Sequence, residues 1–122
     1  MTTVLALVDD LMFLSRIREA GRGAEVEVRT VRTSEALVSA CREGRPALVL
    51  ADLDSARLPV IAAIEALRAE TDLVDVKIVG FVSHMNADRA QSGREAGCTL
   101  VLARSAFVQD LPELLRGAPG AS

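Results

Sequence analysis

Short apolar runs alternate with longer amphipathic runs along this chain of 122 residues, and this alternation restricts the fold more than any other feature. Continuous apolar runs are typical of strands buried on both faces of a parallel sheet. The amphipathic runs between them are typical of helices that cover such a sheet. The predicted strands span residues 3–8, 25–31, 47–53, 76–82 and 98–103, and the predicted helices span residues 11–21, 33–44, 59–70, 87–97 and 107–116.

The strict order of strand and helix predicts one α/β domain over residues 1–116, followed by a flexible tail over residues 117–122. The predicted architecture is a five-stranded parallel sheet with helices on both of its faces. Strand 25–31 alternates apolar and polar residues, which favours a half-exposed edge strand.

Glycine and proline residues mark several predicted helix boundaries. We expect Gly21 and Gly44 to end the first two helices. Pro59 should lie in the first turn of the third helix, and Pro112 near the start of the fifth.

The predicted helices differ in strength. Leu11, Leu14 and Ile17 share one face of the first helix, which should pack on the sheet. The fourth helix contains Ser92 and Gly93, which lower its helix propensity. We therefore expect the fourth helix to be soft.

The composition of the chain restricts the classes of molecule that we expect it to bind. No apolar run is long enough to cross a bilayer, and no secretory signal is visible. A net charge of −3, with no Trp or Tyr, predicts no attraction to nucleic acid or to an anionic membrane. Cys41 and Cys98 match no metal-ligand spacing, so we expect two small buried side chains in a reducing cytoplasm.

Polar residues follow four of the predicted strands. Since the carboxyl ends of parallel strands meet at one edge of the sheet, these residues should lie close together. Clustered carboxylates repel one another unless a cation compensates them, and Mg²⁺ is a suitable oxygen-bound ion. In strand order, the residues are Asp9 and Asp10, Asp52 and Asp54, Ser83 and His84, and Arg104 and Ser105.

Three segments of this chain resemble the receiver domain of bacterial response regulators, the CheY-like phosphorylatable module of two-component phosphorelay signalling. "LVDD" resembles the acidic pair of that family, and "TSEALVSACREGRPALVLADL" resembles the run that ends on its phosphoacceptor aspartate. "REAGCTLVLARSAF" resembles the run that leads to the family lysine. The likeness covers residues 3–116 and implies a flavodoxin-like (βα)5 fold, α/β, with a doubly wound parallel five-stranded sheet in the strand order 2-1-3-4-5.

The resemblance implies a specific site. Asp52 would be the phosphoacceptor, and Mg²⁺ would bind Asp9, Asp10, Asp52 and the backbone carbonyl of Asp54. The metal would neutralise the phosphoryl oxygens while the Asp52 carboxylate attacks a phosphodonor. The implied product is an acyl phosphate that changes the protein surface.

Two residues that sense the phosphoryl group in the family differ here. Arg104 stands in register with the family lysine, and Lys77, the single lysine of the chain, is predicted to lie at the opposite edge of the sheet. The exchange is not conservative, because a planar guanidinium does not copy a compact ammonium group. Val82 stands in register with the family Thr or Ser, and Ser83 is a substitute if the backbone bulges locally.

Three further positions depart from the family pattern. Ala56 replaces a proline, Val60 replaces a glycine, and Val101 replaces an aromatic switch residue. The ion-binding half of the site therefore matches the family, whereas the phosphoryl-sensing half is altered. This combination is typical of an atypical receiver, or pseudo-receiver.

Each candidate residue also has a plainer interpretation. Asp10 is placed to cap the following helix, and Asp52 and Asp54 are also consistent with ordinary strand-end residues. Arg104 is either a surface residue or the partner of Asp52 in a permanent ion pair that mimics or blocks phosphorylation. His84 fits a surface loop better than a phosphocarrier.

Three functional hypotheses follow. The first is a stand-alone atypical receiver that acts by protein–protein contact, with Asp52 phosphorylation impaired or absent. The second is a receiver phosphorylated conventionally at Asp52 with Mg²⁺. The third, remote hypothesis is a small DxD phosphatase, suggested by "LVLADLDSA". For a receiver, the expected partner is a histidine kinase or a downstream effector that binds residues 87–116, and a homodimer is an alternative assembly.

Overall fold

The computed structural model describes residues 2–83 and 85–116. Within them, a five-stranded parallel sheet has the order β2-β1-β3-β4-β5, which confirms the predicted order 2-1-3-4-5. The expectations for His84 and for the tail 117–122 lie outside the described residues. The strands are β1 (Thr2–Leu7), β2 (Val26–Thr30), β3 (Leu48–Asp52), β4 (Ile78–Val82) and β5 (Leu100–Ala103).

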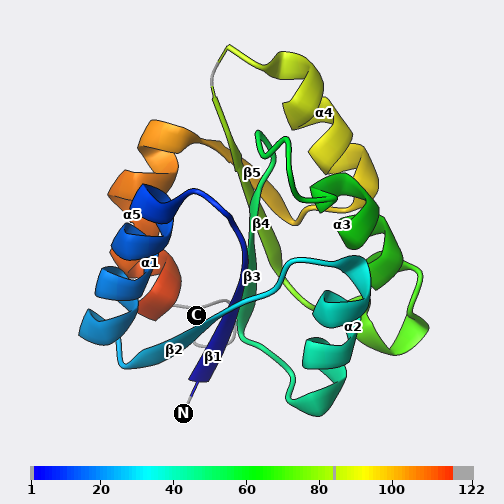
Figure 1. Cartoon of the computed structure of the whole chain (residues 1–122), viewed down its shortest axis with the longest axis horizontal. Coiled ribbons are helices and arrows are strands. Elements are labelled where there is room, and N and C mark those ends of the chain that lie inside the picture. Colours follow the sequence, from blue (N-terminus) through cyan, green and yellow to red (C-terminus); the bar gives the residue numbers. More distant parts are fainter. Residues whose placement is uncertain (1, 84, 117–122) are drawn as a thin grey trace.

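Helices cover both faces of the sheet. Helices α1 and α5 lie on one face, and α2, α3 and α4 lie on the other (Figure 1). A short 3-10 turn, η1 (Thr71–Leu73), precedes β4 and was not predicted. No helix among the described residues has both the length and the apolar character needed to span a bilayer. The helices are α1 (Leu11–Gly23), α2 (Ser34–Glu43), α3 (Val60–Arg68), α4 (Ala87–Ala96) and α5 (Arg104–Arg116).

The central strands divide their side chains between two apolar cores. In β1, Leu5 and Leu7 face the core under α2 and α3, while Val4 and Ala6 face the core under α1 and α5. Every residue of β3 and β4 is buried, as their continuous apolar runs predicted. Strand β2 lies at an edge and is largely exposed, as its alternating pattern predicted.

Leu53 packs into a notch between β4 and α4. A Cβ atom built on Gly93 would lie 2.6 Å from Cδ1 of Leu53, and one built on Gly80 would lie 2.8 Å from the same atom. A larger residue at either position would therefore force Leu53 to shift. Gly93 weakens α4 as an isolated helix, but it lets α4 approach the residue that follows β3.

Helix α1 differs from its predicted form. Leu11 is 79% exposed, because it is the first residue of the helix and precedes Leu14, the first residue to reach the core. Gly21 does not end the helix, which continues to Gly23. Gly21 is instead a contact point with β2, since a Cβ atom there would lie 2.9 Å from Cγ2 of Val28.

Two prolines and one cysteine also differ from expectation. Pro59 lies just before α3 rather than in its first turn. Pro112 lies inside α5, because this helix begins at Arg104 instead of residue 107. The buried face of α5 outweighs the hydrogen bond that proline removes. Cys98 is half-buried rather than buried and lies before the edge strand β5, whereas Cys41 is buried as expected.

Candidate functional site

Asp52 is a buried carboxylate at the carboxyl end of β3. Its exposure is 2%, and among the described residues it is the one charged side chain that is fully buried. Burial raises the pKa of Asp52 above its ordinary value, while the neighbouring Arg104 guanidinium and the backbone N–H of Asp54 oppose this rise. Desolvation thus outweighs the attraction of the cation.

Arg104 is the partner of this carboxylate. Arg104 is the first residue of α5. Its Nη2 lies 3.2 Å from Oδ1 of Asp52 and 3.1 Å from Oδ2. Its Nε donates to Oδ2 of Asp54 at 3.1 Å. One guanidinium therefore contacts both Asp52, which ends β3, and Asp54, in the loop that follows. The Arg104 side chain is 28% exposed. The arrangement contains the Arg104–Asp52 ion pair that the sequence left as one alternative, while the effect of this pair on phosphorylation remains a prediction.

An aromatic stack supports Arg104 from its flat face. The guanidinium carbon lies 4.3 Å from the ring centroid of Phe13 and 5.7 Å from that of Phe81. Phe81 stacks in turn on Phe107, with centroids 4.2 Å apart. A cation over an aromatic face is stabilised by the ring quadrupole. Phe13 is thus a positioning residue that the sequence analysis did not identify.

The Asp54 side chain ties together three segments. Its Oδ2 accepts from the backbone N–H of Ser83 at 2.7 Å, as well as from Arg104. Its Oδ1 accepts from Nδ2 of Asn86 at 3.1 Å, and Asn86 Oδ1 accepts from the Arg89 N–H and so caps α4. From the sequence, the backbone carbonyl of Asp54 was expected as a metal ligand, and Asn86 was not identified. The signal for Asn86 was its position immediately before a predicted helix.

The two aspartates after β1, Asp9 and Asp10, make different contacts. Asp9 Oδ1 accepts from the Ser55 hydroxyl at 2.9 Å, which links the pair to the loop after β3. Asp10 is exposed, and its Oδ1 accepts from the N–H groups of Met12 and Phe13. Asp10 therefore caps α1, as its plainer interpretation predicted.

Val82 and Ser83 end β4 without placing a hydroxyl on Asp52. Val82 is buried in the core under α2, α3 and α4. The Ser83 hydroxyl accepts from the Met85 N–H at 3.3 Å, so this residue serves the site through its backbone N–H.

The carboxylates do not form a ready metal site in this arrangement. Both oxygens of Asp52 accept from Arg104, and one oxygen of Asp10 caps α1. Over residues 2–83 and 85–116, no group of three His, Cys, Asp or Glu side chains is arranged to hold a metal ion. The described residues therefore show no assembled Mg²⁺ site in this arrangement, and the magnesium site remains a prediction.

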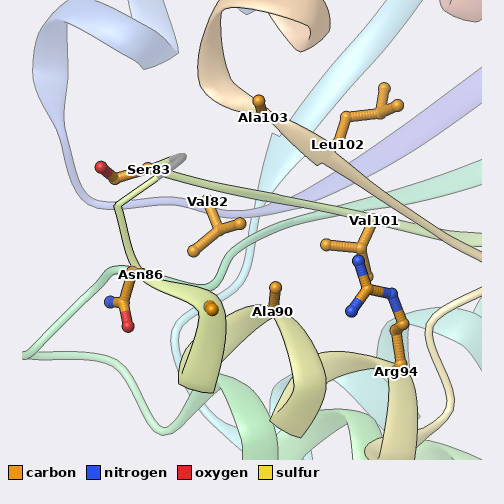
Figure 2. Close-up of a pocket in the computed structure, with 9 residues that line it drawn as sticks. Val82, Ser83, Asn86, Ala90, Arg94, Val101, Leu102 and Ala103 are labelled. Atoms are coloured by element: carbon orange, nitrogen blue, oxygen red, sulfur yellow. The ribbon is translucent and has the colours of Figure 1, made fainter.

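A groove lies beside this site, between α4 and β5 (Figure 2). Its volume is about 260 Å³. Val82, Ala90 and Val101 provide small apolar walls, and Arg94 extends beside Val101. Val101 is one of the residues that line this groove.

No protein-family model and no curated protein match this sequence. Solved structures nevertheless share its fold. Response regulator RPA3017, in red light signalling of R. palustris, has a TM-score of 0.78 and 19% identity over 100% of this chain and 96% of its own. The receiver domain of sensor histidine kinase PA1611 from Pseudomonas aeruginosa PAO1, with a magnesium ion in its active-site cleft, has a TM-score of 0.78 and 21% identity, with 98% of each chain covered. A response regulator receiver domain protein from Clostridium thermocellum has a TM-score of 0.75 and 18% identity, over 98% of this chain and 95% of its own. The chain therefore has the fold of receiver domains.

Proposed function

We propose that this chain is an atypical receiver module that signals by protein–protein contact, with the Asp52–Arg104 ion pair standing in place of phosphorylation. The observation that carries the proposal is the contact of Arg104 Nη2 with both carboxylate oxygens of Asp52, at 3.2 and 3.1 Å. The receiver fold and the resemblance of the "LVDD" and "LVLADL" segments support the same function.

The ion pair opposes phosphorylation of Asp52 for two reasons. A charge-assisted hydrogen bond to each oxygen lowers the nucleophilicity of the Asp52 carboxylate. Arginine also does not lose its proton in proteins, so the positive charge beside Asp52 remains near neutrality. Since Asp54 and Phe13 hold the same guanidinium, Arg104 leaves Asp52 only if several contacts break together.

Two structural neighbours carry a divalent metal ion: one has magnesium in its active-site cleft, and the other is the Mn²⁺-bound form of response regulator Rcp1. In this chain Arg104 already supplies a positive charge to Asp52. We propose that Mg²⁺ and Arg104 compete for the same carboxylate. Asp9 and Asp52 would hold the ion once Arg104 is removed, and the ion would supply charge neutralisation there.

We place the partner-binding surface on α4, β5 and α5, within residues 87–116. The groove between α4 and β5 supports this choice, because it is open and has small apolar walls. A histidine kinase or a downstream effector is the proposed partner class, and a second copy of the chain is the alternative occupant.

Intact-mass analysis after incubation with Mg²⁺ and acetyl phosphate tests the proposal. We expect no phosphoryl adduct on the wild type or on Asp52→Asn, under conditions that label a conventional receiver in a parallel tube. The double variant Val82→Thr/Arg104→Lys restores both family residues, and we expect it to acquire an adduct.

An adduct on the wild type that is absent from Asp52→Asn would overturn the proposal and establish conventional phosphorylation. Turnover of a chromogenic phosphate ester, lost in Asp52→Asn, would overturn it in favour of the DxD phosphatase.

A further inference from the structure

Three hydrogen-bond donors from separate segments converge on one carboxylate, that of Asp54. The backbone N–H of Ser83 lies 2.7 Å from Oδ2, the Nδ2 of Asn86 lies 3.1 Å from Oδ1, and the Nε of Arg104 lies 3.1 Å from Oδ2. The carboxylate is largely buried, with 18% of the side chain exposed. The donors come from the end of β4, the residue before α4 and the start of α5.

These donors form the kind of site that binds a small oxyanion. A backbone N–H, a side-chain amide and a guanidinium are all donors, and the guanidinium adds a positive charge. Asp54 is attached to the chain through the loop after β3, so its carboxylate is present at a high effective concentration. The site is therefore filled without any free ligand.

We propose that Asp54 is a built-in anion, which occupies an oxyanion site formed by Ser83, Asn86 and Arg104. When the Asp54 carboxylate is removed, the site accepts a small external carboxylate such as formate. The inference follows from the hydrogen-bond geometry and does not require the proposed function.

The Asp54 carboxylate also contacts two residues of the groove between α4 and β5. Ser83 and Asn86 both line that groove, and Asn86 caps α4 through its side-chain oxygen. Arg89, in the first turn of α4, donates to the backbone carbonyl of Leu53 at 2.7 Å. The loop after β3 is thus bonded to α4 and to the segment before it, and Asp54 supplies the charged part of this link.

The test is chemical rescue of Asp54→Ala with sodium formate, at ionic strength matched with sodium chloride. We expect Asp54→Ala to melt at a lower temperature than the wild type, because three donors lose their acceptor. Formate should then raise its melting temperature by roughly 3–6 °C near saturation, as ligand binding to the folded state does. Proton–nitrogen spectra should show the Ser83 amide returning toward its wild-type position.

Asp88→Ala is the matched control, because Asp88 is an exposed acid in the first turn of α4. Neither this variant nor the wild type should respond to formate. An equal response in all three proteins would overturn the proposal. If Asp54→Ala is unfolded without added anion, formate must restore its folded spectrum. The milder variant Asp54→Ser must then show a saturable rise in melting temperature with formate. Failure of both would also overturn the proposal.

Discussion

Arg104 Nη2 contacts both carboxylate oxygens of Asp52, while Arg104 Nε contacts Oδ2 of Asp54 at 3.1 Å. A single cation from the start of α5 thus serves two carboxylates, one at the end of β3 and one in the loop that follows. Since guanidinium is planar, it satisfies both at once. This geometry explains how a buried Asp52 is tolerated although the described part of the chain shows no assembled metal site around it.

Replacing Arg104 by methionine should expose a latent divalent-ion site. Without the guanidinium, Asp52 loses its partner, and we expect the variant to be about 1–3 kcal/mol less stable than the wild type, because Arg104 is partly exposed. Thermal unfolding in a Mg²⁺ titration should then show a larger stabilisation of Arg104→Met than of the wild type. Arg94→Met removes an exposed arginine of α4 and serves as the control. Identical Mg²⁺ responses in Arg104→Met and the wild type would contradict competition between the two cations.

The stability gained by Asp52→Asn should depend on pH. Burial raises the pKa of Asp52 in the folded protein, so folding favours the protonated carboxyl. Ionised Asp52 therefore lowers stability as pH rises from about 4, the ordinary value, through the higher folded-state pKa. Urea unfolding in a metal-free buffer should show a larger advantage of Asp52→Asn at pH 7 than at pH 4. An advantage that shrinks with rising pH would show that Arg104 outweighs desolvation.

Gly93→Ala should destabilise the protein although alanine favours helices. Its Cβ would lie 2.6 Å from Cδ1 of Leu53, so we expect a loss of about 1–3 kcal/mol from overpacking. Leu53→Val in the same chain should recover part of this loss. Gly23→Ala in α1 is the matched control, because its Cβ meets no atom within 4 Å, and it should be neutral or stabilising. Chemical denaturation of the variants measures all three effects.

Helix α4 should exchange its amide protons faster than α3. The buried residues of α4 are only Ala90, Gly93 and Ala96, which remove little apolar surface from water. Helix α3 buries larger side chains, including Ile64 and Leu67. Hydrogen exchange followed by mass spectrometry compares the two helices directly. Equal protection of α4 and α3 in the free protein would refute the predicted softness of α4.

Cys98 should resist alkylation in the folded protein. Burial raises the pKa of its thiol to about 11, and the pKa of Cys41 is also raised by burial. At pH 8 the reactive thiolate of Cys98 is therefore a fraction of about 0.001 of the total. Iodoacetamide and intact-mass analysis should show no modification under native conditions and two additions in concentrated urea. Rapid native labelling would show that β5 opens readily.

The sequence by itself determined the layered fold and the residues that meet at the functional edge. Continuous apolar runs define β3 and β4 because both faces of a central strand are buried. Asp52 and Arg104 were predicted to share an edge because the carboxyl ends of parallel strands align there. The strands follow from the periodicity of apolar residues, which is a local property of the sequence. The shared edge follows from the regular topology of a parallel sheet.

Only the tertiary structure decided which groups contact one another at that edge. The sequence left Arg104 open between a surface residue and an ion-pair partner, and it missed Phe13 and Asn86. In the sequence, Gly93 indicated only a low helix propensity. In the structure, Leu53 packs into the space beside Gly93 that a side chain there would occupy. Such contacts depend on loop conformation and on side-chain direction to within about an ångström, because hydrogen bonds and close packing fail beyond that range. That precision arises only when segments distant in sequence pack together.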